Sequence, residues 1–343
     1  MKRRKNMMNS ASNIPLGTMI KGKWHHQHYR IVKELGKGAN GVVYLAESPK
    51  GQVALKVSDD SMLIASEVNV LKSFSKAPVK TMGPSFYDMD DALYPGMSEK
   101  RSFYVMEYVR GPLLLEFVKQ KGDEWIVVLM IQLLSNLAHL HKEGWIFGDL
   151  KPDNLIVSGP PATIRCIDVG GTTKAGRAIK EYTEFFDRGY WGFGTRKAEP
   201  SYDLFALSMV MVNCAYKKEF KKGAEPEKQL YRAIEGHPLL KRYERVLKAA
   251  LQGKYQSASD MKSAMLKEGQ LLASRKSRQK KPSQQNRQKP AVPQHQQAAP
   301  SRSRVAAAKR TSVRKKSGGL FETILILCSV LALYCAYVVL FLL

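Results

Sequence analysis

Hydrophobic and polar positions alternate along the first third of this 343-residue chain. Residues 29–58 carry apolar residues at nearly every second position between glycines, which predicts three antiparallel strands. Residues 61–74 have apolar positions near helical spacing, and residues 103–108 are typical of a further strand. The pattern therefore predicts a small sheet with one helix.

The pattern becomes helical after residue 112. An apolar face predicts a helical segment over 113–142, then an apolar helix over 201–216 and two or three amphipathic helices within 228–272. Short apolar runs at 146–147 and 155–157 predict strands on either side of a polar loop. The chain is therefore expected to have an α+β fold.

The last seventy residues have a different composition. Residues 273–317 contain fourteen Lys and Arg and no acid, within a net charge of +25, and such a segment buries too little apolar surface to order itself. Residues 324–343 carry no charge, and at ~1.5 Å per residue they span a ~30 Å bilayer core. We expect a disordered basic linker at 273–319 and a transmembrane helix at 320–343.

Other features bear on the location of the chain. Four cysteines without a CxxC pair indicate a reducing compartment. The basic N-terminus lacks the apolar segment of a secretory signal. We therefore expect a single-pass protein of the cell membrane, with a C-terminal anchor beside anionic lipid and the folded part in the cytoplasm.

A glycine-rich turn lies within the first strands. Gly36, Gly38 and Gly41 form a G-x-G-x-x-G pattern, in which the missing side chains let the backbone approach phosphates. A dinucleotide-binding fold needs a helix after this pattern, whereas Val43 and its neighbours continue a strand. The sequence excludes that fold, and a simple glycine-rich hairpin remains the alternative to a phosphate loop.

Two charged residues follow on the next elements. Lys56 stands alone on an apolar strand, where an edge charge is the alternative to phosphate binding. A phosphate-binding lysine needs a carboxylate to orient it. Glu67 on the following helix is the candidate, and an exposed helix glutamate is the alternative.

The polar loop D-L-K-P-D-N carries the strongest signal in the sequence. It places Asp149, Lys151 and Asn154 within six residues, and Asp168 leaves a strand into glycines fourteen residues later. On one loop, the carboxylate suits a hydroxyl nucleophile, the amine suits a phosphate and the amide suits a metal ion. We interpret the loop as a site of phosphoryl transfer.

Taken in order, these residues resemble the signature set of protein kinases, and in particular bacterial eukaryotic-type (Hanks-type) serine/threonine kinases. The resemblance implies a two-lobed protein-kinase fold, with a flexible arm at 1–25, a β-rich N-lobe at 26–110 and a helical C-lobe at 111–272. It also implies ATP and Mg²⁺ as cofactors, with Mn²⁺ as an alternative metal, and proteins with Ser or Thr as substrates.

The resemblance assigns roles to single residues. It implies that Asp149 and Lys151 are catalytic and that Asn154 and Asp168 bind the metal, while Asp203 resembles the structural aspartate of the large C-lobe helix. The implied ATP site consists of the glycine loop, the strand lysine with its partner and the hinge, namely Gly36, Gly38, Gly41, Val43, Lys56, Glu67, Glu107 and Val109.

The chain departs from the family pattern at several places. Phe147 and Gly148 replace the His-Arg pair before Asp149, so the arginine that binds a phosphorylated loop is missing, and Val169 replaces a phenylalanine. No A-P-E sequence occurs near residue 190, and Lys254 replaces the arginine that pairs with its glutamate. We expect four candidate phosphorylation sites to contribute through substrate docking rather than a phosphate switch: Thr172, Thr173, Thr183 and Thr195.

Two other functions remain open. A small-molecule kinase of the aminoglycoside-phosphotransferase type shares the Gly148–Asp149 pair, although Lys151 and the apolar helix at 201–216 argue against it. A pseudokinase could scaffold proteins or DNA at the membrane, although the key polar residues are all present. Phosphate transfer from ATP to a generic protein would separate the three.

The basic linker suggests a polyanionic partner. The layout is similar to the tail-anchored, DNA-stimulated kinases of spore-forming bacilli, and cations far from the membrane suit DNA phosphates without base readout. The candidate DNA-binding residues are Arg275, Lys276, Arg278, Lys280 and Lys281. Homodimers are expected on DNA or through small residues on one side of the transmembrane helix, which are Cys328, Ala332, Cys335 and Ala336.

Overall fold

The computed structural model of the chain describes residues 14–38, 40–76, 82–94 and 100–279. Within these residues, six strands form one antiparallel sheet in the order β1-β2-β3-β4-β6-β5. The strands are β1 (Met19–Lys21), β2 (His28–Gly38), β3 (Gly41–Ser48), β4 (Gly51–Ser58), β5 (Phe86–Leu93) and β6 (Lys100–Glu107).

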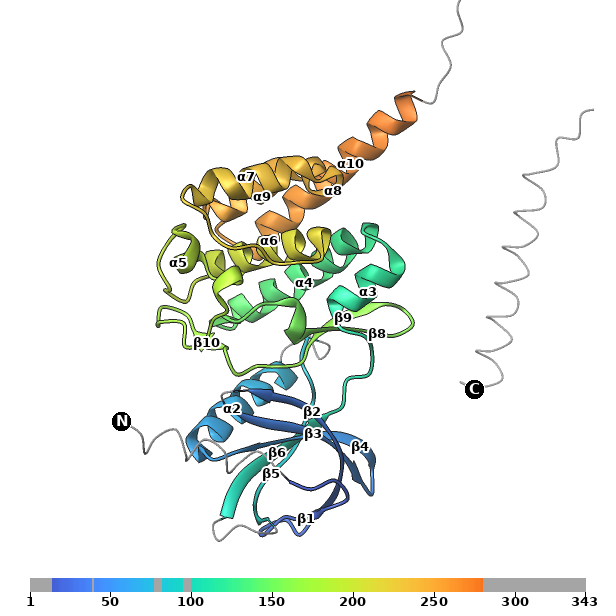
Figure 1. Cartoon of the computed structure of the whole chain (residues 1–343), viewed down its shortest axis with the longest axis vertical. Helices are drawn as coiled ribbons and strands as arrows, with labels where there is room; N and C mark the ends of the chain where they lie inside the picture. The colour runs from blue at the N-terminus through green and yellow to red at the C-terminus, as the bar shows by residue number, and fades with distance from the viewer. Residues whose placement is uncertain (1–13, 39, 77–81, 95–99, 280–343) are drawn as a thin grey trace, which may run out of the picture. The chain divides into compact units, whose positions relative to one another are not determined.

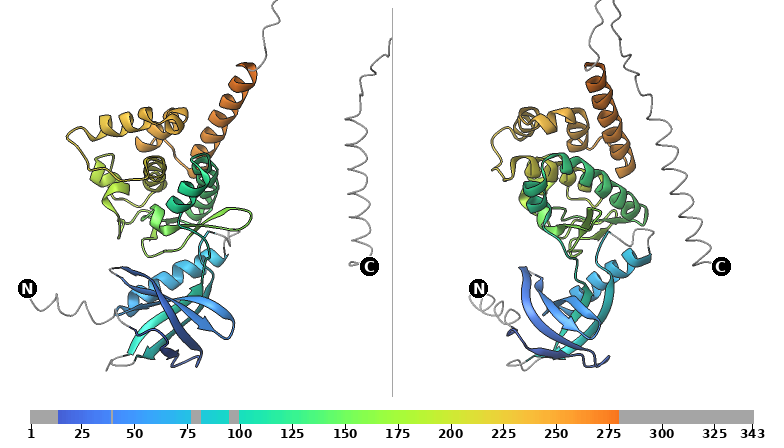
Figure 2. Two further views of the ribbon diagram at one scale, coloured as in Figure 1. Left: turned by 45° about the vertical axis from the view of Figure 1, so that its right-hand side comes forward. Right: turned by 90° about the vertical axis from the view of Figure 1, so that its right-hand side faces the viewer.

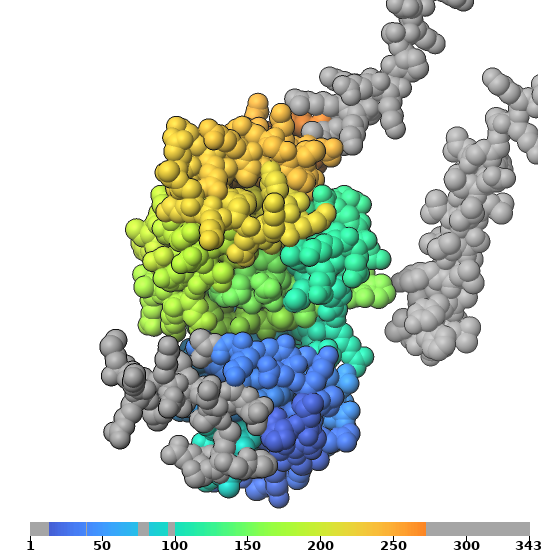
Figure 3. Space-filling model, in the orientation of Figure 1, coloured from blue at the N-terminus to red at the C-terminus, as the bar shows by residue number. Residues whose placement is uncertain are grey.

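Both faces of this sheet are apolar, and each has its own core. On one face Tyr44, Leu55 and Phe103 belong to a cluster of buried side chains. On the other face α2 (Ser61–Lys76) packs against β4, β5 and β6, and Ile64 and Leu71 are fully buried there. Figure 2 shows α2 lying along the sheet. The sheet and α2 form the N-lobe, drawn in blue in Figures 1 and 3.

The remaining elements form a mainly helical C-lobe, green to orange in Figure 1. Its helices are α3 (Leu114–Lys121), α4 (Glu124–Lys142), α5 (Arg188–Trp191), α6 (Pro200–Tyr216), α7 (Pro226–Gly236), α8 (Pro238–Arg242), α9 (Glu244–Leu251) and α10 (Ala258–Gln279). Short strands and 3-10 turns lie on the side facing the N-lobe: β7 (Trp145–Ile146), η1 (Pro152–Asn154), β8 (Leu155–Ser158), β9 (Thr163–Cys166), β10 (Thr173–Lys174) and η2 (Glu184–Phe186). The two-lobed fold expected from the sequence is confirmed.

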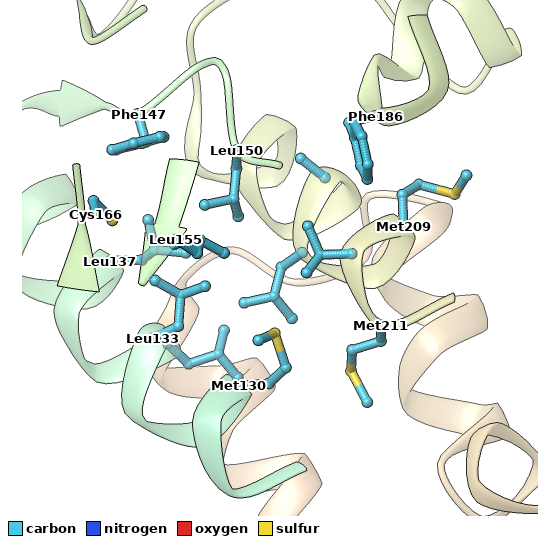
Figure 4. Close-up of a cluster of buried hydrophobic side chains, with 14 of the residues drawn as sticks. Met130, Leu133, Leu137, Phe147, Leu150, Leu155, Cys166, Phe186, Met209 and Met211 are labelled. Atoms are coloured by element: carbon cyan, nitrogen blue, oxygen red, sulfur yellow. The ribbon is translucent and has the colours of Figure 1, made fainter. Parts of the chain in front are cut away.

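The C-lobe core positions the polar loop. Leu133 and Leu137 of α4 are fully buried in one cluster that also contains Met209 of α6, and Phe147 and Leu150 enter the same cluster from the loop (Figure 4). Apolar residues at three- and four-residue spacing give α4 this buried face, whereas α6 is buried on nearly every side. The loop is therefore attached to close-packed helices, which resist displacement.

Several boundaries differ from the sequence-based expectation. β1 lies within the expected arm at 1–25, and the segment 113–142 is broken into α3 and α4 at Gly122, whose φ of 107° ends a helix. β5 was not predicted, because its sequence FYDMDDAL carries three acids. The segment expected to hold two or three helices contains α7 to α10 in the structure. α10 continues to Gln279, so the first seven residues of the expected linker are helical.

The rest of the linker and the expected transmembrane helix at 320–343 lie outside the described residues. None of the helices that the structure does describe is both long and apolar enough to cross a membrane.

Candidate active site

A buried carboxylate of α6 holds the start of the polar loop. Asp203 Oδ2 accepts a hydrogen bond from Phe147 N at 2.8 Å, and Oδ1 accepts one from Gly148 N at 2.9 Å. His141 Nε2 lies 2.8 Å from the same Oδ2. Asp203 is fully buried, and burying a carboxylate is strongly unfavourable unless hydrogen bonds replace its hydration. These three partners supply such bonds. Gly148 has φ 84°, and an added Cβ would lie 2.6 Å from Gly171 O.

Three polar side chains of the loop meet one threonine from a later part of the chain. Lys151 Nζ donates to Asp149 Oδ2 at 2.6 Å, and Asn154 Nδ2 donates to Asp149 O at 2.8 Å and Oδ2 at 3.2 Å. The Thr183 hydroxyl donates to Asp149 Oδ1 at 3.2 Å and accepts from Lys151 Nζ at 3.1 Å. Asp149 and Asn154 are buried. The structure therefore places a threonine side chain against the carboxylate and the ammonium together.

Asn154 and Asp168 lie beside each other because β8 and β9 pair. Ile167 N donates to Asn154 O at 2.9 Å, next to the paired residues Leu155 and Cys166. Asp168 follows directly and keeps about half of its side chain exposed. Amide and carboxylate oxygens are the ligands that Mg²⁺ prefers. These two side chains are therefore suited to hold a divalent ion.

A buried ion pair lies across from them in the N-lobe. Lys56 Nζ on β4 donates to Glu67 Oε1 on α2 at 2.7 Å, and the Tyr104 hydroxyl donates to Glu67 Oε2 at 2.9 Å. Asp168 Oδ1 lies 3.9 Å from Lys56 Nζ. Burial opposes the charged form of Lys56, but Asp168 and Glu67 outweigh it and raise the pKa of the lysine. Lys56 therefore stays cationic at neutral pH, facing the polar loop.

The glycines of the β2–β3 hairpin, two at the end of β2 and one at the start of β3, differ in their roles. Gly41 has φ 134°, and an added Cβ would lie 2.2 Å from Val57 O, so a side chain there would collide with β4. Among the described residues, added Cβ atoms on Gly36 and Gly38 would meet no atom within 4 Å beyond their chain neighbours. Val43 pairs with both Gly36 and Lys56 in the sheet. The hairpin thus leaves open space at β2, which β3 separates from the lysine strand β4, and a phosphate group can enter this space.

The predicted hinge carries an ion pair between the lobes. Arg165 of β9 donates to Glu107 Oε2 at 2.9 Å and to Gly83 O at 2.6 Å. Hydrogen bonds from Arg165 lower the pKa of Glu107, assisted by the backbone of Ser85. The Glu107 side chain is thus committed to this contact, and only the main chain near Glu107 and Val109 is suited to meet a ligand.

Comparison with known proteins shows to which family the chain belongs. Residues 29–284 match the model of the protein kinase domain. The chain belongs to the protein kinase family. It is 63 % identical over 334 residues to the serine/threonine-protein kinase YabT of Bacillus subtilis (strain 168), a match that covers 97 % of each chain. The kinase is also 29 % identical over 160 residues to the probable serine/threonine-protein kinase PknB of Lactococcus lactis subsp. lactis, covering 43 % of this chain and 24 % of that one.

Solved structures share the fold. The kinase domain of Mycobacterium tuberculosis PknI matches with a TM-score of 0.51 at 18 % identity, covering 75 % of this kinase and all of that chain. Vaccinia related kinase 3 matches with a TM-score of 0.55 at 15 % identity, covering 79 % and 95 %. The sequence relatives identify this kinase as a Hanks-type serine/threonine protein kinase. They favour this interpretation over a small-molecule phosphotransferase.

The four candidate threonines lie in different surroundings within residues 168–200, which we call the activation segment. Thr172 and Thr173 are buried, and the Thr173 hydroxyl donates to Gly171 O at 3.0 Å. Thr183 contacts Asp149, as described above, and Thr195 is exposed. Phosphorylation of Thr172 or Thr173 would require the segment to open, whereas Thr195 is accessible in the kinase as it is folded.

Buried charged side chains anchor this segment. Arg188 is buried, and its Nη2 donates to Glu199 Oε1 at 2.7 Å. Asp187 is also buried and accepts from Arg196 Nη2 at 2.7 Å and from the Tyr202 hydroxyl at 2.9 Å. No spacing in the sequence predicts these pairs. They anchor the segment although no A-P-E sequence occurs near residue 190.

We expect Asp203→Asn to lower the kcat of the kinase by about tenfold to a hundredfold, because one of the two loop N–H groups would face an amide donor and Asp149 would shift. KM for ATP should change by less than about threefold, since the N-lobe is untouched. Steady-state kinetics measure both. The control is Ser208→Ala, a buried change on the same helix whose hydroxyl bonds only within α6 to Leu204 O. Wild-type kcat in Asp203→Asn would show that the loop does not depend on this carboxylate.

Proposed function

We propose that this kinase transfers the γ-phosphoryl group of ATP to serine and threonine hydroxyls of proteins, including its own chain. The observation that carries the proposal is the Thr183 hydroxyl, 3.2 Å from Asp149 Oδ1 and 3.1 Å from Lys151 Nζ. A transferred phosphoryl group needs an acceptor hydroxyl beside a carboxylate that takes its proton and a cation that neutralises its charge. The site already holds a threonine in that way.

The residues present fit ATP and a divalent ion. The open space over Gly36 and Gly38 suits phosphates, and Asn154 and Asp168 would hold Mg²⁺ or Mn²⁺ through their oxygens. ATP supplies the phosphoryl group and the ion supplies positive charge to it. Lys56, oriented by Glu67, would bind the α- and β-phosphates.

The base and the acceptor are positioned by other parts of the chain. The backbone near Glu107 and Val109 would receive the adenine. Asp149 would orient the acceptor hydroxyl and accept its proton, and Lys151 would neutralise charge that develops on the transferred group. Because none of these groups forms a bond to the phosphate, catalysis rests on positioning and electrostatics.

Lys56→Ala, Asp149→Asn and Asp168→Asn should each lower autophosphorylation by at least about a thousandfold, because each removes an interaction used mainly in the transition state. Transfer of labelled phosphate from ATP to the kinase and to a generic protein measures the effect, with circular dichroism to verify folding. Lys50→Ala, an exposed lysine in the turn before β4, should retain normal activity. Normal autophosphorylation in Asp149→Asn would refute the assignment.

We propose in addition that the segment 320–343 anchors the kinase in the cell membrane with its catalytic part in the cytoplasm. The uncharged sequence of twenty residues and the cluster of cations before it support this topology. A chain ending at residue 319 should move from the membrane pellet to the soluble fraction after cell lysis. In sealed inverted vesicles, an added protease should digest the kinase domain of the full chain. Protection of the domain there would contradict the topology.

The linker cations support a second partner, DNA, which would gather several kinases on one polyanion. Tethering raises the local concentration for phosphorylation between chains to the order of mM. Binding through phosphates alone should be insensitive to DNA sequence and should weaken with salt, since log K falls by about 0.9 per phosphate neutralised for each decade of salt. Fourteen cations without an acid suit this role.

The basic cluster at 275–281 should mediate this stimulation. Replacing Arg275, Lys276, Arg278, Lys280 and Lys281 with Gln should reduce the response of autophosphorylation to DNA by about tenfold and leave the basal rate intact. The matched control neutralises five cations next to the predicted membrane helix, Lys309, Arg310, Arg314, Lys315 and Lys316, and should retain most of the response. If neutralising both clusters left the stimulation unchanged, the linker would be only a spacer.

A further inference from the structure

Side chains of the activation segment alternate between two sides just before η2. Lys180, Tyr182 and Glu184 are exposed, whereas Ile179 and Phe185 are buried, and the residues between them are half-buried. Such a period of two is typical of an extended chain, and Thr183 has φ −106° and ψ 127°. Glu181 and Thr183 therefore lie on the same, inward side of the segment.

Glu181 reaches the glycine loop from this inward side. Asn40 Nδ2, in the turn between β2 and β3, donates a hydrogen bond to Glu181 Oε1. The two residues are 141 positions apart in the chain and belong to different lobes. The turn that precedes Gly41 is thus tied to the activation segment across the cleft.

The carboxylate of Glu181 also crowds the phosphate side of the site. A Cβ built on Gly170 would lie 3.0 Å from Glu67 Oε1, 3.2 Å from Asp168 Oδ1 and 3.7 Å from Glu181 Oε1. Three carboxylates thus share the surroundings of one ammonium, Lys56. Glu67 and Asp168 are already close to that lysine. A third negative charge there opposes the entry of anionic phosphates.

We propose that Glu181 is an autoinhibitory latch, which holds the glycine loop closed on the activation segment and has to leave before nucleotide phosphates bind. This inference rests on the proposed ATP site. The Glu181 carboxylate accepts a hydrogen bond from Asn40 and is near enough to Lys56 to help raise the pKa of that lysine, so nucleotide phosphates would compete with it for both partners. Nucleotide would therefore bind only when the Asn40 hydrogen bond opens. The apparent Kd for nucleotide is then the Kd of the open state divided by the fraction of molecules that are open.

The latch also couples the two halves of the site. Thr183 is two residues after Glu181, on the same side of the extended segment, and its hydroxyl contacts Asp149. Expelling Glu181 displaces the chain that holds this hydroxyl. Nucleotide binding would thus make Asp149 more accessible to an acceptor from another protein.

The test measures binding of a non-hydrolysable ATP analogue with Mg²⁺ to the full chain in detergent, by calorimetry. Glu181→Ala and Asn40→Ala should each lower Kd by about threefold to tenfold, and the double variant should bind no more tightly than the better single variant, since both remove one contact. Glu184→Ala is the matched control, an outward-facing glutamate of the same segment, and should leave Kd unchanged. Hydrogen exchange of residues 36–41 should become faster in Glu181→Ala without nucleotide.

The outcomes separate the latch from the proposed function. Unchanged or weaker binding in both Glu181→Ala and Asn40→Ala, with tight binding by the wild-type chain, would overturn the latch alone. Failure of the wild-type chain and of both variants to bind the analogue would overturn the proposed ATP site. Asn40→Ala changes a half-buried residue of a turn, so it keeps the test decisive if Glu181→Ala fails to fold.

Discussion

The catalytic half of the site depends on one buried charge, the carboxylate of Asp203. Burying a carboxylate in the first turn of an apolar helix is unfavourable unless hydrogen bonds replace the lost water. The backbone N–H groups of Phe147 and Gly148 supply them, together with His141. The same bonds fix the backbone directly before Asp149. The buried Asp203 carboxylate thus keeps its hydrogen-bond partners when the polar loop follows this path.

This arrangement explains why the chain tolerates Phe147 and Gly148 in place of the usual His-Arg pair. Asp203 contacts the main chain of these two residues, and any residue offers a main-chain N–H. The side chains are therefore free to serve the packing. Phe147 is buried in the C-lobe core, and Gly148 adopts a positive φ where a Cβ would collide with Gly171.

Local sequence signals predicted the small sheet with its helix, the later helices, the polar loop and the strand lysine, because period, glycine and proline act within a few residues. The two-lobed arrangement was implied by the family resemblance. Local signals failed where the decisive contact is distant. β5 looks too acidic for a strand, but Asp90 accepts hydrogen bonds from the backbone of Trp24 and His25, which lie far away in the chain. The ion pair of Glu107 with Arg165 and the Asn40–Glu181 contact join residues 58 and 141 positions apart. Neither has a sequence pattern of its own.

The activation segment is held by buried charges of its own. Arg188 donates to Thr195 O, the Ser201 hydroxyl and Glu199, all within 2.7 Å. Asp187 caps α5 at its backbone and also pairs with Arg196. Buried and charge-assisted contacts of this kind are stronger than exposed ion pairs. They hold the segment in this shape with charges that the chain already carries, and Thr195 lies exposed beside them.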